Sequence, residues 1–194
     1  MGGLWFFSTR SIEKPKYSVL EKKDGYEIRQ YEPYIIAYVE VEGGYREALN
    51  KGFRLVADFI FGNNKSNSKI AMTSPVQEME SEKIAMTSPV IEGEIDDVGL
   101  HTISFVMPSK YTLDTIPVPN NEKVFIKEVP ERKVAVLSYS WYPNDSRIAV
   151  KKQKLINMLE NDSVEFVGKP ESAFYNPPFT PPFMLRNEVL IEIK

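Results

Sequence analysis

His101 is the only histidine in the 194-residue chain, so any imidazole chemistry depends on this one side chain. It begins the alternating segment His101–Met107, in which Ile103 and Phe105 share its face. Two interpretations are open. The commoner is a strand-end histidine bonded to backbone or water, and the other is an axial ligand to iron. A single histidine excludes a cluster of histidine metal ligands.

The sequence offers little for catalysis. It contains no cysteine, which excludes disulfides, thiol nucleophiles and thiolate metal sites. No G-x-S-x-G, P-loop or G-x-G-x-x-G motif is present. Carboxylates gather at Glu78–Glu82 and Glu94–Asp97, but both runs lie in polar connectors, where solvated acidic loops are expected. These residues predict a protein that is not an enzyme.

Flexible and aromatic apolar residues are in modest surplus, with ten tyrosines, eleven phenylalanines, two tryptophans and seven methionines. Aromatic side chains on a curved sheet can stack on a flat ligand ring. Met72 and Met86 are candidate weak axial ligands, although methionine at such positions more often fills a core. Arg54, Lys65 and Lys69 could pair with ligand carboxylates, or could be ordinary solvated charges.

The composition is that of an ordinary globular protein, with 42% hydrophobic residues and a formal net charge of -3. This charge gives no general attraction to nucleic acid or anionic lipid. The apolar start, Met1–Phe7, is too short to span a membrane and lacks the features of a signal peptide. We expect a cytoplasmic monomer, with residues 1–16 as an N-terminal extension and residues 17–194 as one domain.

The first half of the chain alternates around an Asp24-Gly25 turn, which predicts a hairpin over Tyr17–Glu32, and continues as a strand over Tyr34–Glu42. A helix is predicted from about Tyr45 to Phe61. Its apolar residues recur at three- and four-residue intervals and define one face. They are Tyr45, Leu49, Phe53, Val56 and Ile60. Strands are predicted over residues 69–76, 83–91 and 100–107.

The second half repeats this order. Strands are predicted over Val124–Val129 and Lys133–Trp141, followed by a helix capped by Asn144 or Asp145 and a closing strand over 188–193. The inner face of this helix contains Ile148, Leu155 and Leu159. Two helices can therefore cover one curved, mainly antiparallel sheet in an α+β fold, with a groove where helix and sheet diverge.

The sequence also contains a short exact repeat within this longer pattern. Lys69–Val76 recurs residue for residue as Lys83–Val90. One interpretation is a short tandem duplication that adds a hairpin of edge strands. The other is a second strand that faces a ligand. Each copy contains a proline, which fits a sheet edge or a strand end better than a central position.

The repeated segment K-I-A-M-T-S-P-V resembles the MTxPV signature of the SOUL/haem-binding protein family. The opening Tyr17-Ser18-Val19 with Glu27–Pro33, the loop Phe61–Asn64 and the strand end Ser104–Pro108 are similar to further family landmarks. Arg186–Val189 matches the terminal R-N-E-V. The landmarks run in the family's order from Tyr17 to Val189, which is nearly the whole chain.

The resemblance implies a distorted antiparallel β-barrel with two flanking helices, built as a pseudo-twofold pair of β-α-β-β units. It also implies non-catalytic binding of haem or another tetrapyrrole in a shallow apolar groove near the first helix. A binding module for other flat hydrophobic molecules, like the bacterial effector-binding domains of similar fold, is the alternative. Phe53, Val56 and Ile60 would line the groove, and Lys65 would meet a propionate. The candidate residues are Phe53, Arg54, Val56, Ile60, Lys65, Met72, Met86 and His101.

One departure from the family pattern concerns the iron. Some animal members are proposed to bind haem iron through a histidine in the N-terminal half, and this chain has no histidine before His101. That mode of ligation cannot be transferred to this sequence. This sequence is more similar in this respect to the family members that hold the porphyrin by apolar contacts.

Overall fold

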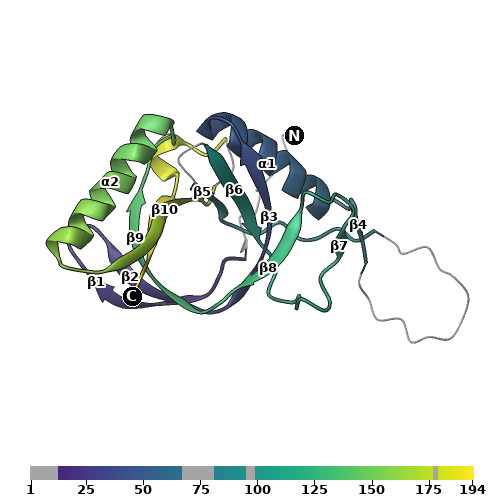
Figure 1. Cartoon of the computed structure of the whole chain (residues 1–194), viewed down its shortest axis with the longest axis horizontal. Coiled ribbons are helices and arrows are strands. Elements are labelled where there is room, and N and C mark those ends of the chain that lie inside the picture. The colour runs from purple at the N-terminus through teal and green to yellow at the C-terminus, as the bar shows by residue number, and fades with distance from the viewer. Residues whose placement is uncertain (1–12, 67–80, 95–98, 177–178) are drawn as a thin grey trace, which may run out of the picture.

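The computed structural model describes residues 13–66, 81–94, 99–176 and 179–194. Within them, nine strands form one curled antiparallel sheet in the order β1-β2-β9-β11-β10-β5-β6-β3-β8, and β4 and β7 form a separate pair. Two helices lie on one side of the sheet (Figure 1). The elements, in chain order, are β1 (Tyr17–Lys22), β2 (Glu27–Tyr31), β3 (Tyr34–Glu42), α1 (Tyr45–Ile60), β4 (Asn64–Lys65), β5 (Val90–Glu94), β6 (Leu100–Val106), β7 (Val118–Pro119), β8 (Phe125–Val129), β9 (Arg132–Tyr139), α2 (Asp145–Asn161), β10 (Phe166–Phe174), a 3-10 turn (Pro182–Met184) and β11 (Asn187–Ile193).

The chain order and the strand order together show two similar halves. One half is β2-β3-α1-β5-β6 and the other is β8-β9-α2-β10-β11. The halves exchange their first strands, because β2 pairs with β9 and β8 pairs with β3. They meet at the centre, where β5 pairs with β10. The predicted α+β fold with a pseudo-twofold repeat is confirmed.

The helix α1 packs very closely on the sheet. A Cβ atom placed on Gly52 would lie 2.4 Å from Cγ1 of Ile103, so only a glycine allows this approach. Ala48 and Val56, which lie four residues before and after Gly52, are both fully buried. The buried face of α1 is therefore rotated from the predicted one, and Phe53 is 40% exposed.

The helix α2 agrees with the sequence prediction. The Asn144 side chain caps it by accepting a hydrogen bond from the backbone N–H of Arg147, at 2.8 Å. Ile148, Leu155 and Leu159 are buried as predicted. Leu155 and Leu159 belong to a core that includes residues of β9 and β11.

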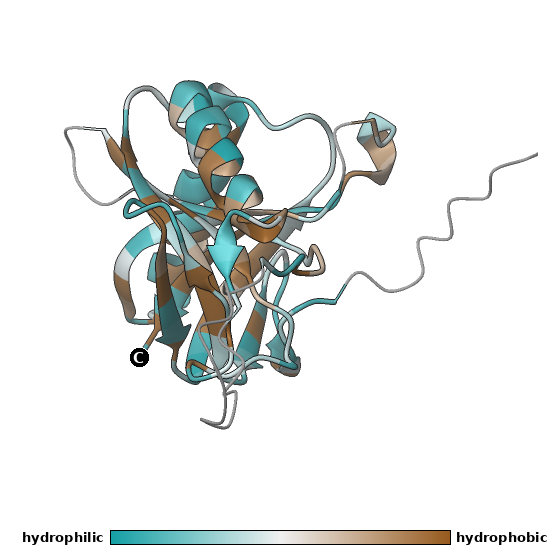
Figure 2. Cartoon of the chain, turned by 90° about the vertical axis from the view of Figure 1, so that its right-hand side faces the viewer, coloured by the Kyte–Doolittle hydropathy of each residue, from teal (hydrophilic) through white to brown (hydrophobic). Residues whose placement is uncertain are grey.

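Apolar cores fill both faces of the sheet. One core lies between α1 and β3 and β6, and another between α2 and β9 and β11. A third lies on the concave face, away from the helices, around Tyr31, Val136 and Leu190. Figure 2 shows hydrophobic residues concentrated on the strands under the helices. Among the residues described, no helix is long and apolar enough to cross a membrane.

The repeated segment behaves differently from the prediction. Its first copy, residues 69–76, lies outside the described residues. The second copy was expected to form a strand over 83–91, but β5 begins only at Val90. Ile84 is instead buried in the core beneath α1 and donates its backbone N–H to the carbonyl of Ile60. Pro89 has no N–H to donate to a ladder, which is consistent with a strand that starts after it.

The end of the predicted N-terminal extension packs against the domain. The backbone carbonyl of Glu13 accepts a hydrogen bond from Ser88, and its side chain accepts one from the backbone of Ser109. Pro15 is buried. Residues 13–16 therefore contribute to the folded body, and residues 1–12 lie outside the described part.

Candidate functional site

The groove predicted beneath the first helix is closed by its own side chains. Val56 is 0% exposed and Ile60 is 1% exposed, and both belong to the core between α1 and the sheet. The prediction that they line an open groove is therefore wrong. The cause is the close approach of α1 at Gly52, which leaves no space for a guest between helix and sheet.

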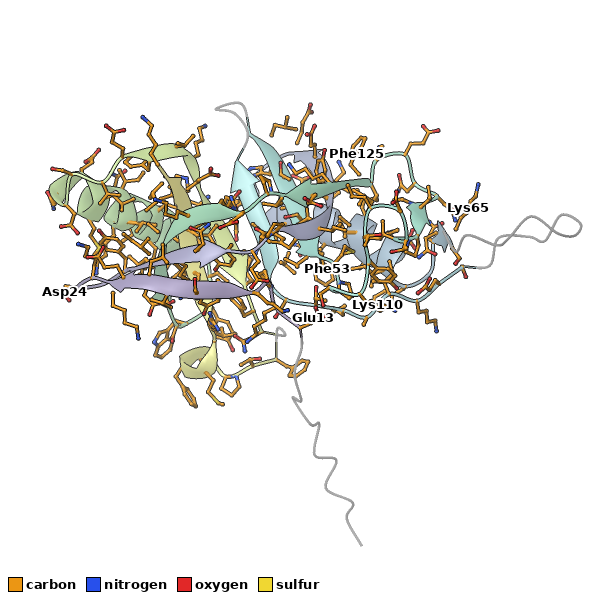
Figure 3. All side chains as sticks on the ribbon, turned by 90° about the horizontal axis from the view of Figure 1, so that it is seen from below. Glu13, Asp24, Phe53, Lys65, Lys110 and Phe125 are labelled. Atoms are coloured by element: carbon orange, nitrogen blue, oxygen red, sulfur yellow. The ribbon has the colours of Figure 1, made fainter. Side chains whose placement is uncertain are left out.

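The other predicted residues of this region lie on the surface. The Phe53 ring packs beside that of Phe105, with centroids 5.2 Å apart, and Arg54 is exposed. Lys65 is exposed on β4 and lies farther toward the end of the molecule than Phe53 (Figure 3). Met86 is 45% exposed, and Met72 lies outside the described residues. The structure does not bring these residues together as one binding site.

His101 lies elsewhere, at the start of β6 and close to the beginning of α1. It is 7% exposed, and its ring packs edge-on against Tyr45 with centroids 6.4 Å apart. Its Nδ1 lies 2.9 Å from Oε1 of Glu92, so its partner is a side-chain carboxylate and not the backbone. A proton on Nδ1 of the neutral ring leaves the lone pair on Nε2, and carboxylate-bonded histidines of this kind commonly ligate metals.

Glu92 is the centre of this region. It is 0% exposed and lies on β5 directly opposite Ser172 of β10, where the two halves of the sheet meet. Its second oxygen, Oε2, lies 3.3 Å from Nζ of Lys152, which comes from α2. One carboxylate thus links β5, β6 and α2.

Three hydroxyl groups near Glu92 have no hydrogen-bond partner within the described part of the chain. They belong to Tyr45, Tyr139 and Ser172, and their oxygens are buried. Burial raises the pKa of Tyr139 to about 12, and it also raises the pKa of Tyr45, with the Glu92 charge adding to both shifts. We call the group Glu92, His101, Lys152, Tyr45, Tyr139 and Ser172 the Glu92 cluster.

A cleft of about 530 Å³ opens above this cluster, between α1 and the start of α2. Tyr45, Arg46 and Leu49 line it from α1. Asn144 and Asp145 line it from the other side. Tyr45 belongs both to this wall and to the Glu92 cluster, and it therefore places the cluster next to the interhelical cleft.

The amino-acid sequence of the whole domain matches that of a known protein family. The model of the SOUL heme-binding protein family matches residues 12–192. The chain belongs to the SOUL family. Heme-binding protein 2 of Mus musculus is 29% identical over 188 residues, covering 93% of this chain and 85% of the relative. Heme-binding protein 2 of Homo sapiens is 27% identical over 185 residues, covering 93% and 84%.

Solved structures of low sequence identity share the fold of this SOUL protein. The EcmrR C-terminal domain superposes with a TM-score of 0.61 at 8% identity, covering 92% of this chain and 98% of that domain. An uncharacterized conserved protein from Listeria innocua gives a TM-score of 0.54 at 12% identity, covering 89% and 93%. At these identities the likeness shows the fold alone.

The sequence patterns of this SOUL protein did not predict most residues of the Glu92 cluster. Two signals could have found them. Lys152 follows Ile148 by four residues and precedes Leu155 by three, which places a lysine on the buried face of α2. Glu92 directly follows the apolar pair Val90 and Ile91, and an acidic residue so close to a buried strand is a second signal.

Proposed function

We propose that this SOUL protein binds a tetrapyrrole, such as haem, in the interhelical cleft and does not chemically alter it. The observation that supports this most is the Glu92–His101 pair beneath the cleft, together with three nearby hydroxyls that are buried without a hydrogen-bond partner among the described residues. The cleft volume of about 530 Å³ is within the range of small-molecule sites.

The energetics support a ligand-binding role for the Glu92 cluster. A buried polar group without a partner costs about 1–3 kcal/mol of stability. Three such hydroxyls lie near one buried carboxylate, and perturbed polar groups of this kind are concentrated at functional sites. A bound ligand with polar substituents could satisfy them.

The lining of the cleft has complementary parts for a tetrapyrrole. Tyr45 and Leu49 offer apolar contact to a flat ring, and the Arg46 guanidinium can pair with a propionate. When haem is the ligand, it supplies an iron that accepts an imidazole nitrogen. His101 fits that role through Nε2, because Glu92 occupies Nδ1. Since the ring is 7% exposed, access requires Tyr45 to turn aside.

A hemin titration followed by the Soret absorbance tests the proposal. We expect saturable binding to the wild type at micromolar concentrations, and a binding constant at least tenfold weaker for His101→Ala. Phe53→Ala is the matched control, because Phe53 lies on the surface of the same helix outside the cleft lining, and it should bind like the wild type. The absence of a saturable change with wild-type protein contradicts the proposal.

A second candidate is a module for other flat apolar molecules. The hydroxyls of Tyr45, Tyr139 and Ser172 favour it, because they need hydrogen-bond partners but no iron. A ligand that binds only the native state raises the unfolding temperature. Stabilisation by planar, hydroxyl- or carbonyl-bearing dyes, together with no effect of hemin, would favour this candidate over the first. In either case the ligand should be recovered unchanged after incubation, as expected for a protein that is not an enzyme.

A further inference from the structure

A second cavity lies on the opposite face of the sheet from the helices. Its volume is about 460 Å³, and its walls come from both halves of the sheet. Ile36, Ile91 and Val129 give it an apolar part. Its lining residues come from strands of the curled sheet that is shown in Figure 1. The sheet itself separates this concave cavity from the interhelical cleft.

The mouth of the concave cavity is shaped by an irregularity in β10. Val167 pairs with Glu192, whereas Glu171 pairs with Leu190, so β10 contains two more residues than β11 over this stretch. Gly168 lies in this bulge with a φ of 73°, a conformation that favours glycine. Val167, Gly168 and Glu171 all line the cavity. Bulges often lie beside functional sites, where they open or redirect a strand.

Arg132 brings a guanidinium group to the wall of this cavity. Its Nη2 donates to the hydroxyl of Tyr34 and to Oε2 of Glu171, each at 3.0 Å. Its Nε–H is buried and has no acceptor among the residues that the structure describes. A guanidinium N–H that is held in place without an acceptor among the described residues can donate to an oxygen of a ligand in the cavity that Arg132 lines.

The charges around the cavity select the kind of acceptor. The cations lining it are Lys127, Arg132 and Lys169, and the carboxylates are Glu128, Glu171 and Glu192. Their formal charges cancel. The Nε–H of Arg132, which has no acceptor among the described residues, therefore favours a ligand with an acceptor oxygen. The balance of charges gives no net attraction to an anionic ligand. A carboxylate ligand would also meet the repulsion of the Glu171 carboxylate on the same guanidinium.

We propose that the concave cavity binds an uncharged apolar molecule that carries a carbonyl oxygen, and that Arg132 hydrogen-bonds this oxygen. The apolar part contacts Ile36 and Ile91, and the ligand enters beside the β10 bulge. This site is independent of the haem proposal, because none of its lining residues belongs to the Glu92 cluster or to the interhelical cleft.

Three naphthalene probes of matched size test the chemistry by isothermal titration calorimetry. They are 2-acetylnaphthalene with an uncharged carbonyl, 2-ethylnaphthalene without oxygen, and 2-naphthoate with a carboxylate. We expect the ketone to bind the wild type about tenfold more tightly than either of the others. Equal binding of ketone and hydrocarbon, no binding of the ketone, or tightest binding of the naphthoate would each overturn the proposal.

Two variants test the location. Arg132→Gln should abolish the advantage of the ketone over the hydrocarbon, with its folding verified by thermal unfolding. Val167 is 49% exposed at the mouth, so Val167→Trp should obstruct entry and weaken both compounds about tenfold without disturbing a core. Hemin affinity should be unchanged in Val167→Trp. Wild-type affinity for the ketone in Val167→Trp would overturn the assignment to this cavity, even if Arg132→Gln fails to fold.

Discussion

Glu188 and Glu92 are both 0% exposed, yet the sheet surrounds them with very different partners. On the concave face, Glu188 accepts hydrogen bonds from Arg29, Arg186, Tyr175 and Ser138, at 2.6–3.1 Å. On the helix face, Glu92 has His101 and Lys152, and the nearby hydroxyls have no partner in the described structure.

We infer from this difference that Glu188 stabilises the fold and that Glu92 belongs to the proposed binding site. A buried charge stabilises a fold when each of its oxygens has well-placed donors, and the Glu188 site meets this condition. The Glu92 cluster, in contrast, contains hydroxyl groups without a hydrogen-bond partner in the described structure, and it lies beside an open cleft. We therefore expect changes at Glu188 to affect folding and changes at the Glu92 cluster to affect ligand binding.

The largest effect on stability is expected from Glu188→Gln. The change removes the buried charge that pairs with both Arg29, whose side chain is 4% exposed, and Arg186. Arg29 keeps its pair with the partly exposed Glu27, and the free energy of unfolding should fall by about 3–5 kcal/mol. Urea unfolding followed by circular dichroism measures it. Glu165→Gln, which removes an exposed pair with Lys194, is the matched control and should change stability by less than about 0.5 kcal/mol. Similar losses in both variants would remove the contrast.

The same carboxylate predicts an acid dependence of stability. Burial alone would raise the pKa of Glu188, but Arg29, Tyr175 and Arg186 outweigh burial and hold the pKa below its ordinary value. Its stabilising contribution is therefore complete above the unfolded-state pKa of about 4.3 and is lost as the pH falls through the lower folded-state value. Unfolding free energies between pH 7 and pH 3 should decline less in Glu188→Gln than in the wild type.

Two tyrosine variants compare the same sites by removing one hydroxyl oxygen from each. The Tyr175 hydroxyl donates to Glu188 at 2.6 Å, so Tyr175→Phe should cost about 1.5–3 kcal/mol. The Tyr45 hydroxyl is buried without a partner in the described structure, so Tyr45→Phe should leave stability unchanged or raise it by up to about 1 kcal/mol. Equal destabilisation by both variants would show that Tyr45 has a structural partner after all.

A smaller loss of stability than that of Glu188→Gln is expected from Glu92→Gln. The amide retains an oxygen acceptor for His101, and Lys152, whose side chain is 18% exposed, can turn toward water. We expect a loss of about 1–2 kcal/mol. Hemin binding should weaken at least tenfold in the same variant, measured by Soret titration. A loss of stability as large as that of Glu188→Gln, with unchanged hemin binding, would reverse the assignment of the two glutamates.

The sequence predicted the fold better than the site. The spacing of apolar residues was sufficient to predict the two halves of the fold and the buried face of α2, because these patterns are local in the sequence. It misplaced the buried face of α1, because the large side chain of Phe53 counted as apolar while Gly52, which has no side chain, sets the approach of the helix. The Glu92 cluster depends on the pairing of β5 with β6 and β10 and on the approach of α2, none of which a local pattern contains.

The most direct test of the functional claim uses the single histidine of the chain. In ¹⁵N-labelled protein, the imidazole nitrogens give one pair of signals, which belong to His101 without further assignment. We predict that a stoichiometric amount of hemin shifts or broadens the Nε2 signal, because the ligand occupies the cleft above the Glu92 cluster. Saturable hemin binding that leaves both imidazole signals unchanged would contradict this account.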